Sequence, residues 1–263
     1  MTPTHHLAQR YGRWAVVAGA SEGLGAAFAE ALAARGLGLV LLARRGDVLA
    51  AVAAELRAAH GVEVRTLACD LADPAFAGEL AAATSDIEVG VAVYNAADSF
   101  VAPLFERPLE DALRVVDVNV RGPLVFAHAL VPAMLARGRG ALVLMSSLAG
   151  FQGSSRLSAY AASKAFNTVL GEGLWGELGP RGVDVVVSCA GAIRTPGYAR
   201  TSAKEAPGTL DPARVVATTL AALGRGPVVV PGATNKLAAF VMRRVLTRRR
   251  AIRIMAGSVR GLE

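Results

Sequence analysis

A strand-length apolar segment, a glycine-rich turn and a helical run follow one another near the start of the chain. They are Trp14–Ala18, Gly19–Gly25 and Ala26 to Arg35. In such a unit the glycines let the backbone approach a ligand closely, and the helix start offers free N–H groups and a positive dipole end to an anion. The unit therefore predicts a turn that holds a dinucleotide pyrophosphate. Its spacing is G-x-x-x-G-x-G rather than G-x-G-x-x-G, and a turn that serves packing alone is the alternative.

Longer-range patterning places this unit in an α/β fold. Apolar runs of strand length alternate with alanine-rich helical segments, which is typical of a parallel sheet with helices on both faces. The 263 residues, 53% of them hydrophobic, suffice for one well-buried domain. We expect a single Rossmann-type, doubly wound α/β domain over residues 1–263. Its further strands are expected at Leu37 to Leu42, Val64 to Cys69, Val89 to Tyr94, Ala141 to Met145, Val183 to Ser188 and Pro227 to Val230.

Composition argues against several other classes of protein. No apolar run reaches the ~20 residues of a membrane span, and residues 1–13 lack the apolar core of a secretory signal. The two cysteines, Cys69 and Cys189, lie in or beside predicted strands, where free cysteine acts as a small apolar residue. Neither a disulfide framework nor a metal site is expected. These features predict a cytoplasmic protein.

A tyrosine and a lysine four residues apart carry the strongest chemical signal. Tyr160 and Lys164 share one helix face, separated by a rise of ~6 Å. A nearby ammonium group lowers the phenol pKa from its usual value of about 10, which makes the phenol a usable proton donor or acceptor. The Ser147 hydroxyl, if brought alongside, would hydrogen-bond a carbonyl or alcohol oxygen. The spacing alone also occurs by chance on many helices, so it needs support from other motifs.

Together the motifs resemble the short-chain dehydrogenase/reductase family, in its short single-domain branch. The glycine turn, Asn95–Ala97, Asn119, and Ser147 thirteen residues before the tyrosine occur in the family's order and approximate spacing. The resemblance covers residues 12 to 200 well and the remainder loosely. It implies an NAD(P)-dependent oxidoreductase that transfers hydride between a nicotinamide and a carbonyl/alcohol pair.

The resemblance implies roles for four catalytic residues. Tyr160 would donate the proton to a carbonyl being reduced, or accept it from an alcohol being oxidised. Lys164 would lower the tyrosine pKa and bind the nicotinamide ribose, and Ser147 would hold the substrate oxygen. Asn119 would hold a water that links the lysine to solvent. The thirteen-residue spacing favours Ser147 over Ser146, whose side chain should point to the other side of the strand.

Cofactor preference is predicted from the residues after the second strand. An acidic residue there would bind the adenosine ribose hydroxyls and repel a 2′-phosphate. Ala43 takes that place and Arg44 follows, with Arg45 and Ser21 in a position to assist. A charge-assisted hydrogen bond of ~1.5–3 kcal/mol gives roughly a tenfold to hundredfold preference, so NADP(H) is expected over NAD(H). If both arginines merely solvate the loop, both cofactors would be accepted.

Further cofactor contacts are implied by the resemblance. Asp70 and Leu71 match positions that contact the adenine, although Asp70 would serve equally as a turn residue that caps the next helix. Ile193 and Thr195 match positions that contact the carboxamide and the phosphates. The expected cofactor-binding set is Gly19, Ser21, Glu22, Gly23, Leu24, Gly25, Arg44, Arg45, Asp70, Leu71, Asn95, Ala96, Ala97, Tyr160, Lys164, Ile193 and Thr195.

Three alanines depart from the family pattern. Ala18, Ala97 and Ala190 stand where threonine, glycine and proline are usual. The first removes a hydroxyl, the second adds a methyl near the cofactor, and the third loosens a turn. None removes a catalytic group, so these changes bear on cofactor affinity more than on chemistry.

Positive charge is concentrated in a basic C-terminal tail, about residues 236–263. Residues 212–263 contain ten Lys or Arg and one acid, whereas residues 1–211 contain eighteen and twenty. A helical wheel shows an apolar stripe that Arg248 interrupts, so a solvated or subunit-packing helix is the simpler interpretation. Weak contact with an anionic membrane is the alternative, and nucleic acid is not expected because no binding module accompanies the charge. The stripe is formed by Leu237, Val241, Val245, Ile252 and Met255.

The substrate is less constrained by the sequence than the chemistry. Pro196 to Asp211 is expected to form a mobile lid over a small-molecule carbonyl or alcohol substrate, with Tyr198 and Arg200 as contacts. Aromatic residues able to line an apolar substrate pocket are Phe100, Phe105 and Phe151.

Two further expectations concern assembly and the rival functions. Apolar helices at Tyr160 to Gly179 and Pro108 to Leu135 predict a homodimer or homotetramer. The rival interpretation is an NADP-binding sensor or interaction protein that retains the fold without turnover. A reductase docked on a membrane surface would differ in location but not in chemistry.

Overall fold

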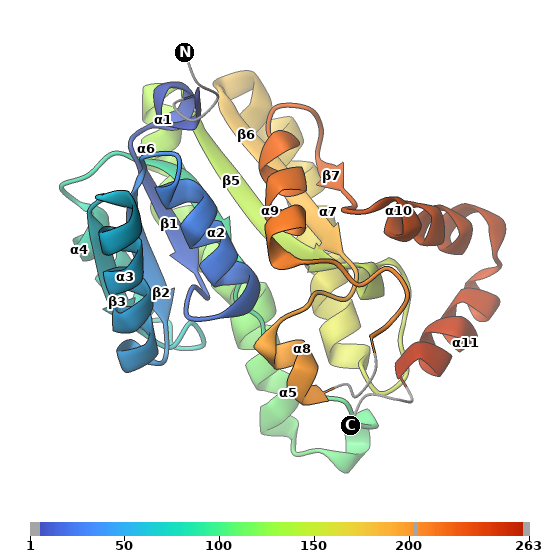
Figure 1. The fold of residues 1–263 in the computed structure, drawn as a ribbon. Coiled ribbons are helices and arrows are strands. Elements are labelled where there is room, and N and C mark those ends of the chain that lie inside the picture. Colours follow the sequence, from blue (N-terminus) through green and yellow to red (C-terminus); the bar gives the residue numbers. More distant parts are fainter. Residues whose placement is uncertain (1–5, 202–204, 260–263) are drawn as a thin grey trace.

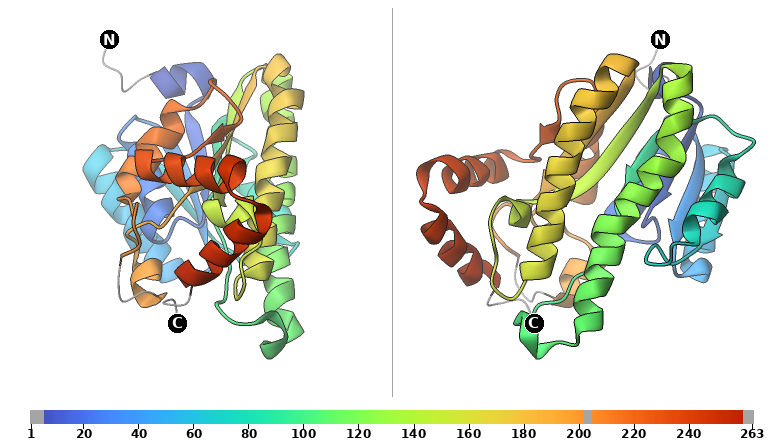
Figure 2. Two further views of the ribbon diagram at one scale, coloured as in Figure 1. Left: turned by 90° about the vertical axis from the view of Figure 1, so that its right-hand side faces the viewer. Right: turned by 180° about the vertical axis from the view of Figure 1, so that it is seen from behind.

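Seven strands form one parallel sheet in the order β3-β2-β1-β4-β5-β6-β7. The computed structural model describes residues 6–201 and 205–259. Successive strands are added on one side of β1 as far as β3 and then on its other side from β4 onward, so the strand order reverses at β1. This is the predicted Rossmann arrangement, and helices cover both faces (Figure 1, Figure 2). The strands are β1 Trp14–Ala18, β2 Gly38–Ala43, β3 Val64–Ala68, β4 Val89–Tyr94, β5 Gly140–Ser147, β6 Val183–Ala190 and β7 Val228–Val229.

Helices α2, α3 and α9 pack on one face of the sheet, and α4, α6 and α7 pack on the other. The helices are α1 His6–Tyr11, α2 Gly23–Ala33, α3 Gly46–His60, α4 Phe76–Thr84, α5 Leu109–Val116, α6 Gly122–Arg137, α7 Ser158–Leu178, α8 Pro196–Thr201, α9 Pro212–Ala221, α10 Ala233–Phe240 and α11 Arg248–Val259. Shorter 3-10 turns are η2 Leu104–Glu106, η4 Leu148–Phe151 and η5 Gly179–Arg181, and π-helical turns are η3 Asp117–Arg121 and η6 Val241–Val245.

Successive side chains of each central strand enter two separate cores. Ala15 and Val17 of β1 face the layer that contains Phe28, whereas Val16 and Ala18 face the layer of α4, α6 and α7. Both faces are covered, so the strand is a continuous apolar run rather than an alternating one. This explains why the strands could be located from the sequence.

Three strands end at other residues than the sequence predicts, and one of these ends places Ser147 on a strand. β5 runs from Gly140 to Ser147, past the predicted end at Met145, and β6 continues to Ala190. β7 is reduced to Val228–Val229. Because β5 extends to Ser147, this serine is the last residue of a central strand.

One continuous helix, Leu109–Arg137, is long and apolar enough to cross a membrane by length and composition, with half of its most apolar window buried. The sequence led us to expect no such segment. The helix combines α5, η3 and α6, and α6 packs on β4 and β5. Core helices of this kind share the composition of membrane spans, so the helix is explained by its packing on the sheet.

The basic tail forms a C-terminal arm, which we define as residues 233–259, and it projects from the edge of the sheet (Figure 1, Figure 2). The single amphipathic helix implied by the helical wheel is wrong. Leu246 takes extended backbone angles, which end η6 and separate it from α11. Arg248 therefore begins a new helix and does not interrupt an apolar stripe.

Candidate active site

The carboxyl ends of four neighbouring strands bring the predicted residues to one edge of the sheet. Ala18 of β1 pairs with Tyr94 of β4, and Ser147 of β5 pairs with Ala190 of β6. Parallel strands end at the same edge, so the segments that follow them meet there. This is the crevice beside the point of reversal, where open α/β sheets bind ligands.

The glycine turn is built around two close backbone approaches. Gly19 has φ +80°, and a Cβ there would lie 2.8 Å from the Ala96 backbone. A Cβ at Gly25 would lie 1.9 Å from the main-chain oxygen of Gly19, so only glycine fits. Asn95 also ties down the turn, because its Nδ2 donates to the Gly19 oxygen at 3.1 Å. Helix α2 then begins at Gly23 without a side-chain cap, which leaves its positive end available to an anion.

Glu22 joins two arginines from distant segments. Its carboxylate lies 2.6 Å from Arg200 of α8 and 3.0 Å from Arg45, which also donates to the Ser21 hydroxyl at 3.3 Å. The hydrogen bonds from Arg200 and Arg45 hold the pKa of Glu22 below its ordinary value. Arg45 is thus engaged within the protein, whereas Arg44 is exposed and forms no ion pair with any described residue.

Tyr160, Ser147 and Lys164 meet at the end of β5. The Ser147 hydroxyl lies beside the Tyr160 phenol and lowers its pKa. Nζ of Lys164 lies 5.5 Å from the centre of the tyrosine ring and donates to the Met145 main-chain oxygen at 3.0 Å. Lys164 is 3% exposed, and this burial lowers its pKa to about 8. The charged lysine is therefore held beside the phenol by a strand carbonyl.

The Tyr160 pKa differs from the expectation for this protein without cofactor. Burial raises it, and the Ser147 hydroxyl only partly offsets this. The phenol is therefore protonated at neutral pH.

The two adjacent serines point to opposite sides, as predicted. Ser146 is buried, and its hydroxyl donates to the Lys164 main-chain oxygen at 2.7 Å and contacts the Thr168 hydroxyl at 2.8 Å. Ser147 is only partly buried, and its hydroxyl faces Tyr160. Ser146 therefore anchors α7 to the strand, and Ser147 is the serine available to a substrate.

Asn119 sits in the π-helical turn η3 and is fully buried. Its amide accepts from the Asp98 N–H at 2.7 Å and donates to the Asp98 oxygen at 2.9 Å and to Ser163 at 3.0 Å. Its own main-chain oxygen accepts from Asn167 at 3.0 Å. Such turns widen a helix and re-aim its groups. Here the turn connects the segment after β4 to the helix that carries Tyr160 and Lys164.

An ion-pair network links Asp70, after β3, with Asp98, which follows the Asn95–Ala97 motif. Arg114 of α5 donates to both oxygens of Asp70, at 3.0 and 3.1 Å, and to Asp98 at 2.9 Å. Partial burial would raise the pKa of Asp70, but the Ala72 N–H and Arg114 hold it below its ordinary value. Asp70 therefore closes a turn, as the sequence alternative allowed, although helix α4 begins only at Phe76.

The remaining predicted contacts lie around the same crevice, to different degrees. Thr195 packs against the glycine turn, because a Cβ at Gly23 would meet its side chain at 3.0 Å. Ile193 forms a bridge to Leu210. Leu71 is buried and Ala97 is exposed. Tyr198 and Arg200 lie on α8, and residues 202–204 of the expected lid lie outside the described residues.

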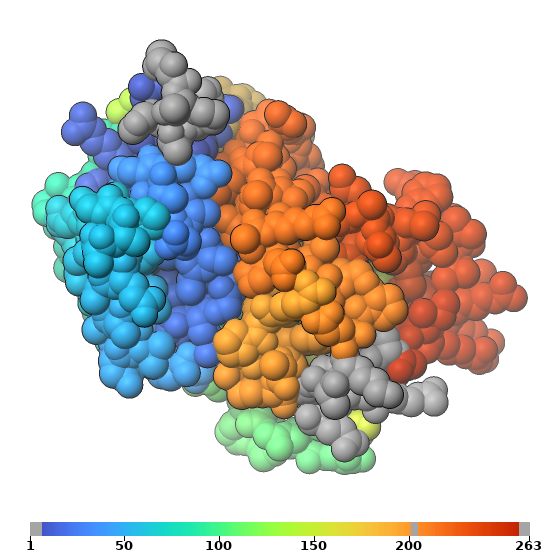
Figure 3. All heavy atoms as spheres, in the orientation of Figure 1, coloured from blue at the N-terminus to red at the C-terminus, as the bar shows by residue number. Residues whose placement is uncertain are grey.

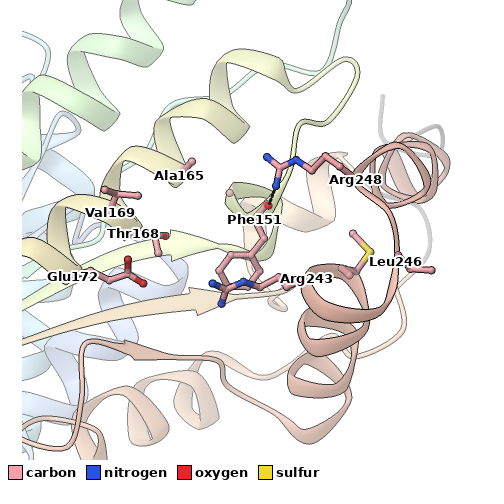
Figure 4. Close-up of a pocket in the computed structure, with 10 residues that line it drawn as sticks. Phe151, Ala165, Thr168, Val169, Glu172, Arg243, Leu246 and Arg248 are labelled. Carbon is pink, nitrogen blue, oxygen red and sulfur yellow. Dashed lines mark hydrogen bonds between the residues drawn. The ribbon is translucent and has the colours of Figure 1, made fainter.

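The aromatic residues proposed for a substrate pocket lie in different surroundings and do not line one apolar pocket. Phe105 is 98% exposed, and Phe100 lies beneath Arg107 with 5.9 Å between the guanidinium and the ring centre. Phe151 lines a cleft of about 330 Å³ between α7 and the C-terminal arm (Figure 4). That cleft also contains Glu172 and Arg243, so it is not an apolar pocket.

Sequence reasoning missed Asp98, Arg114 and the structural role of Ser163. Asp98 directly follows the Asn95–Ala97 motif and Ser163 lies inside the Tyr-Lys motif, so both positions were within reach. Arg114 pairs with an acid 44 residues away, and no local pattern indicates such a pair.

Comparison with known proteins identifies the family. Residues 13–206 match the family described as short chain dehydrogenase. The 7β-hydroxysteroid dehydrogenase of Collinsella aerofaciens is 34% identical over 191 residues, which are 73% of each chain. A very-long-chain 3-oxoacyl-CoA reductase of Aspergillus clavatus is 35% identical over 178 residues, 66% of this chain and 52% of that protein. The inactive hydroxysteroid dehydrogenase-like protein 1 of Homo sapiens is 33% identical over 182 residues, 68% of this chain and 55% of that protein. The chain thus spans about half the length of the latter two.

Solved structures agree with this assignment. A structure from a study of 7β-hydroxysteroid dehydrogenase stereoselectivity has a TM-score of 0.89 at 30% identity, covering 95% of this chain and 98% of that one. A short-chain dehydrogenase from Sphingobium yanoikuyae in complex with NADPH has a TM-score of 0.77 at 32% identity, covering 84% and 88%. The resemblance noted from the sequence is confirmed: the chain belongs to the short-chain dehydrogenase/reductase family and is an NAD(P)-dependent oxidoreductase.

Proposed function

We propose that the protein interconverts a carbonyl and a secondary alcohol, with NADP(H) as its preferred cofactor and Tyr160 as its acid/base. The observation that carries this is the meeting of the Tyr160 phenol with the Ser147 hydroxyl, beside a buried Lys164. These groups converge at the edge of the sheet where the glycine turn also lies. The presence of all three residues favours an active enzyme over the rival function without turnover.

The chain's residues support proton transfer in both directions. In reduction, the Tyr160 O–H donates to the substrate oxygen, and the Ser147 hydroxyl donates a second hydrogen bond to that atom. The phenolate left behind is stabilised by the Lys164 ammonium in a site of low dielectric. In oxidation the phenolate accepts the proton, so the same groups serve both directions. Asn119 supports the relay, since its main-chain oxygen has a second lone pair for a water that connects Lys164 to solvent.

The glycine turn fits a dinucleotide, because the space beside Gly19 and Gly25 excludes a Cβ and the start of α2 has no side-chain cap. Gly19–Gly25 would hold the pyrophosphate, Asp70 and Leu71 the adenine, and Asn95–Ala97 the adjoining ribose. Ile193, Thr195 and Lys164 would hold the nicotinamide end. When bound, the nicotinamide supplies or accepts the hydride.

Preference for NADP(H) rests on Arg44. It follows β2, at the place where an acid would select NAD(H), and its exposed guanidinium forms no ion pair with a described residue, although its charge helps to lower the pKa of Asp70. Arg45 and Ser21 flank it, although Arg45 already neutralises Glu22. Support also comes from the Sphingobium yanoikuyae relative, which was solved with NADPH.

The names of the relatives favour a hydrophobic ketone or the corresponding alcohol as substrate. They include 7β-hydroxysteroid dehydrogenases, 3-oxoacyl-CoA reductases and an alcohol dehydrogenase specific for bulky-bulky ketones. One relative is named inactive, which corresponds to the rival sensor function. We favour turnover because the tyrosine, lysine and serine are all present and in contact.

We also propose a homo-oligomer, in line with the apolar surface of two long helices. Leu109 and Leu113 of α5 and Val169 and Trp175 of α7 are 67%, 50%, 68% and 43% exposed. Large apolar side chains gathered on helix surfaces are typical of subunit interfaces. A monomer by light scattering would contradict this.

The function is tested by oxidation of NADPH and of NADH with a panel of ketones, including a 7-oxosteroid and a 3-oxoacyl thioester. Tyr160→Phe should abolish turnover while NADPH binding persists. Tyr11→Phe is the matched control, because Tyr11 is a buried tyrosine that bonds Asp184 away from the site. NADPH binding without turnover of any ketone by the wild type would favour the sensor. Absence of NADPH binding would overturn both functions.

A further inference from the structure

The C-terminal arm carries positive charge that the protein leaves unneutralised. Residues 212–262 contain no Asp or Glu. Within the described residues, no ion pair joins an arginine of the arm to an acid. Two of these arginines are used elsewhere, since Arg243 stacks on Phe151 and Arg248 bonds its main-chain oxygen (Figure 4). The remaining four are exposed and form no side-chain hydrogen bond or ion pair with another residue of the ranges 6–201 and 205–259; they are Arg244, Arg249, Arg250 and Arg253.

Large apolar side chains stand exposed between these arginines. Leu237, Phe240, Val245 and Ile254 are 65%, 58%, 64% and 52% exposed. Residues three, four or seven apart on a helix share a face. Leu237 and Phe240 therefore share one face of α10, and Ile254 lies beside Arg250 on α11. Arg244 lies in the π-helical turn η6 that follows α10. The arm thus presents apolar and cationic side chains together on its outer surface.

The arm also stands apart from the first strands and their helices (Figure 1). It protrudes at one edge of the molecule, away from the helices that flank the first strands (Figure 1, Figure 3). An extended surface can reach it without first meeting the body of the protein.

We propose that the C-terminal arm docks the enzyme on an anionic lipid bilayer. The four free arginines pair with lipid phosphates, and the four exposed apolar side chains enter the boundary between headgroups and acyl chains. A nucleic acid would satisfy the arginines but leave the aliphatic side chains in water. A second copy joined arm to arm would bring two strongly cationic segments together. An anionic bilayer satisfies both kinds of side chain.

Docking through these residues is compatible with the catalytic arrangement. Arg243 and Arg248 hold Phe151, and the proposed lipid contacts do not include them. Truncation of the whole arm would remove the proposed lipid contacts together with Arg243 and Arg248. Its effect on membrane binding could then not be separated from its effect on the turn that contains Phe151. Substitution of the four free arginines removes the proposed lipid contacts and keeps the contacts to Phe151. The docking proposal does not depend on the reaction proposed above.

The test is sedimentation of the full chain with vesicles of phosphatidylcholine alone, or of phosphatidylcholine and phosphatidylglycerol in equal parts. The wild type should bind the anionic vesicles, and added salt should release it. Each arginine near an anionic surface contributes roughly a fivefold factor. The variant with Arg244, Arg249, Arg250 and Arg253 all replaced by Gln should therefore bind roughly several hundredfold more weakly.

A matched control removes the same charge elsewhere. Arg13, Arg181, Arg214 and Arg225 are exposed, lie off the arm and form no side-chain hydrogen bond or ion pair with a described residue. Their replacement by Gln should leave most of the binding intact. Equal losses in the two variants, or no binding by the wild type, would overturn the proposal. A second experiment measures the oligomeric state of the Leu237→Ser and Phe240→Ser variants by light scattering. Conversion of an oligomer to a monomer would show that the arm is a subunit interface instead.

Discussion

The guanidinium of Arg248 donates a hydrogen bond of 2.7 Å to the main-chain oxygen of Phe151, which lies 97 residues earlier in the chain. Arg243 adds a second contact, 4.5 Å from the centre of the Phe151 ring (Figure 4). Phe151 ends the turn η4, and that turn starts directly after Ser147, whose hydroxyl accepts from the Ala149 N–H at 3.2 Å. The arm therefore holds the turn that fixes the direction of the candidate catalytic serine.

Replacement of Arg248 by Ala should lower kcat with little change in cofactor affinity, because the turn after Ser147 loses its external support. A hydrogen bond from a charged but exposed donor contributes about 1 kcal/mol, so the expected loss is about fivefold. Steady-state kinetics at saturating NADPH measure it. Arg249→Ala, one residue further along, is the control and should keep the wild-type kcat. If kcat is the same in R248A and wild type, the turn holds Ser147 without the arm.

Lys164 should reduce the stability of the folded protein at neutral pH. Its pKa is about 8 when folded, against 10.5 for an ordinary lysine, so the unfolded chain holds the proton more tightly between these values. Stability should therefore rise with pH through that window, and below about pH 8 the cost is about 3 kcal/mol. Lys164→Met removes this cost but leaves the Met145 carbonyl unpaired, which costs about 1 kcal/mol.

The inactive Lys164→Met variant should thus be about 2 kcal/mol more stable than wild type at pH 7, and should lose this advantage near pH 10. Urea unfolding at the two pH values measures both differences. Lys236→Met, at an exposed position, should show no such pH dependence. A Lys164→Met variant that is less stable than wild type at pH 7 would mean that the buried ammonium stabilises the fold.

The positions of the strands could be predicted from the sequence because they rest on local patterns, although the ends of β5, β6 and β7 differ from those predicted. Runs buried on both faces, such as Val89–Tyr94, are legible as uninterrupted apolar segments, and the segment after each run could be assigned to one edge. The adjacent Ser146 and Ser147 could be separated by the alternation of a strand alone.

Contacts between distant segments were not predictable in the same way. The pairing of Glu22 with Arg200 spans 178 residues, and the network from Arg114 to Asp70 and Asp98 depends on how α5 lies across the sheet edge. The raised pKa of Tyr160 also depends on burial, whereas the Tyr-Lys spacing alone suggests a lowered one. The break in the arm is set by one extended residue, Leu246, in a segment whose composition is helical throughout.

Glu22 should weaken discrimination in favour of NADP(H). Its carboxylate lies 3.0 Å from Arg45, beside the expected 2′-phosphate site, and therefore competes with that phosphate for the guanidinium. Glu22→Gln should raise the ratio of kcat/KM for NADPH over NADH by about threefold to tenfold, in line with one exposed charge interaction. Arg44→Ala should lower the ratio by at least tenfold. A ratio unchanged in both variants would place the 2′-phosphate site elsewhere.

Gly25→Ala should abolish cofactor binding, because the added Cβ would lie 1.9 Å from the Gly19 main-chain oxygen and the turn cannot close around it. The backbone would have to move, which displaces the N–H groups that face the pyrophosphate. Gly78→Ala is the matched control within another helix, where nothing lies within 4 Å of the new methyl. It should keep full NADPH binding and gain roughly 0.5–1 kcal/mol in unfolding free energy. NADPH titration by fluorescence and urea unfolding of both variants separate the two effects. Wild-type NADPH affinity in a folded Gly25→Ala variant would show that the cofactor does not lie against this turn.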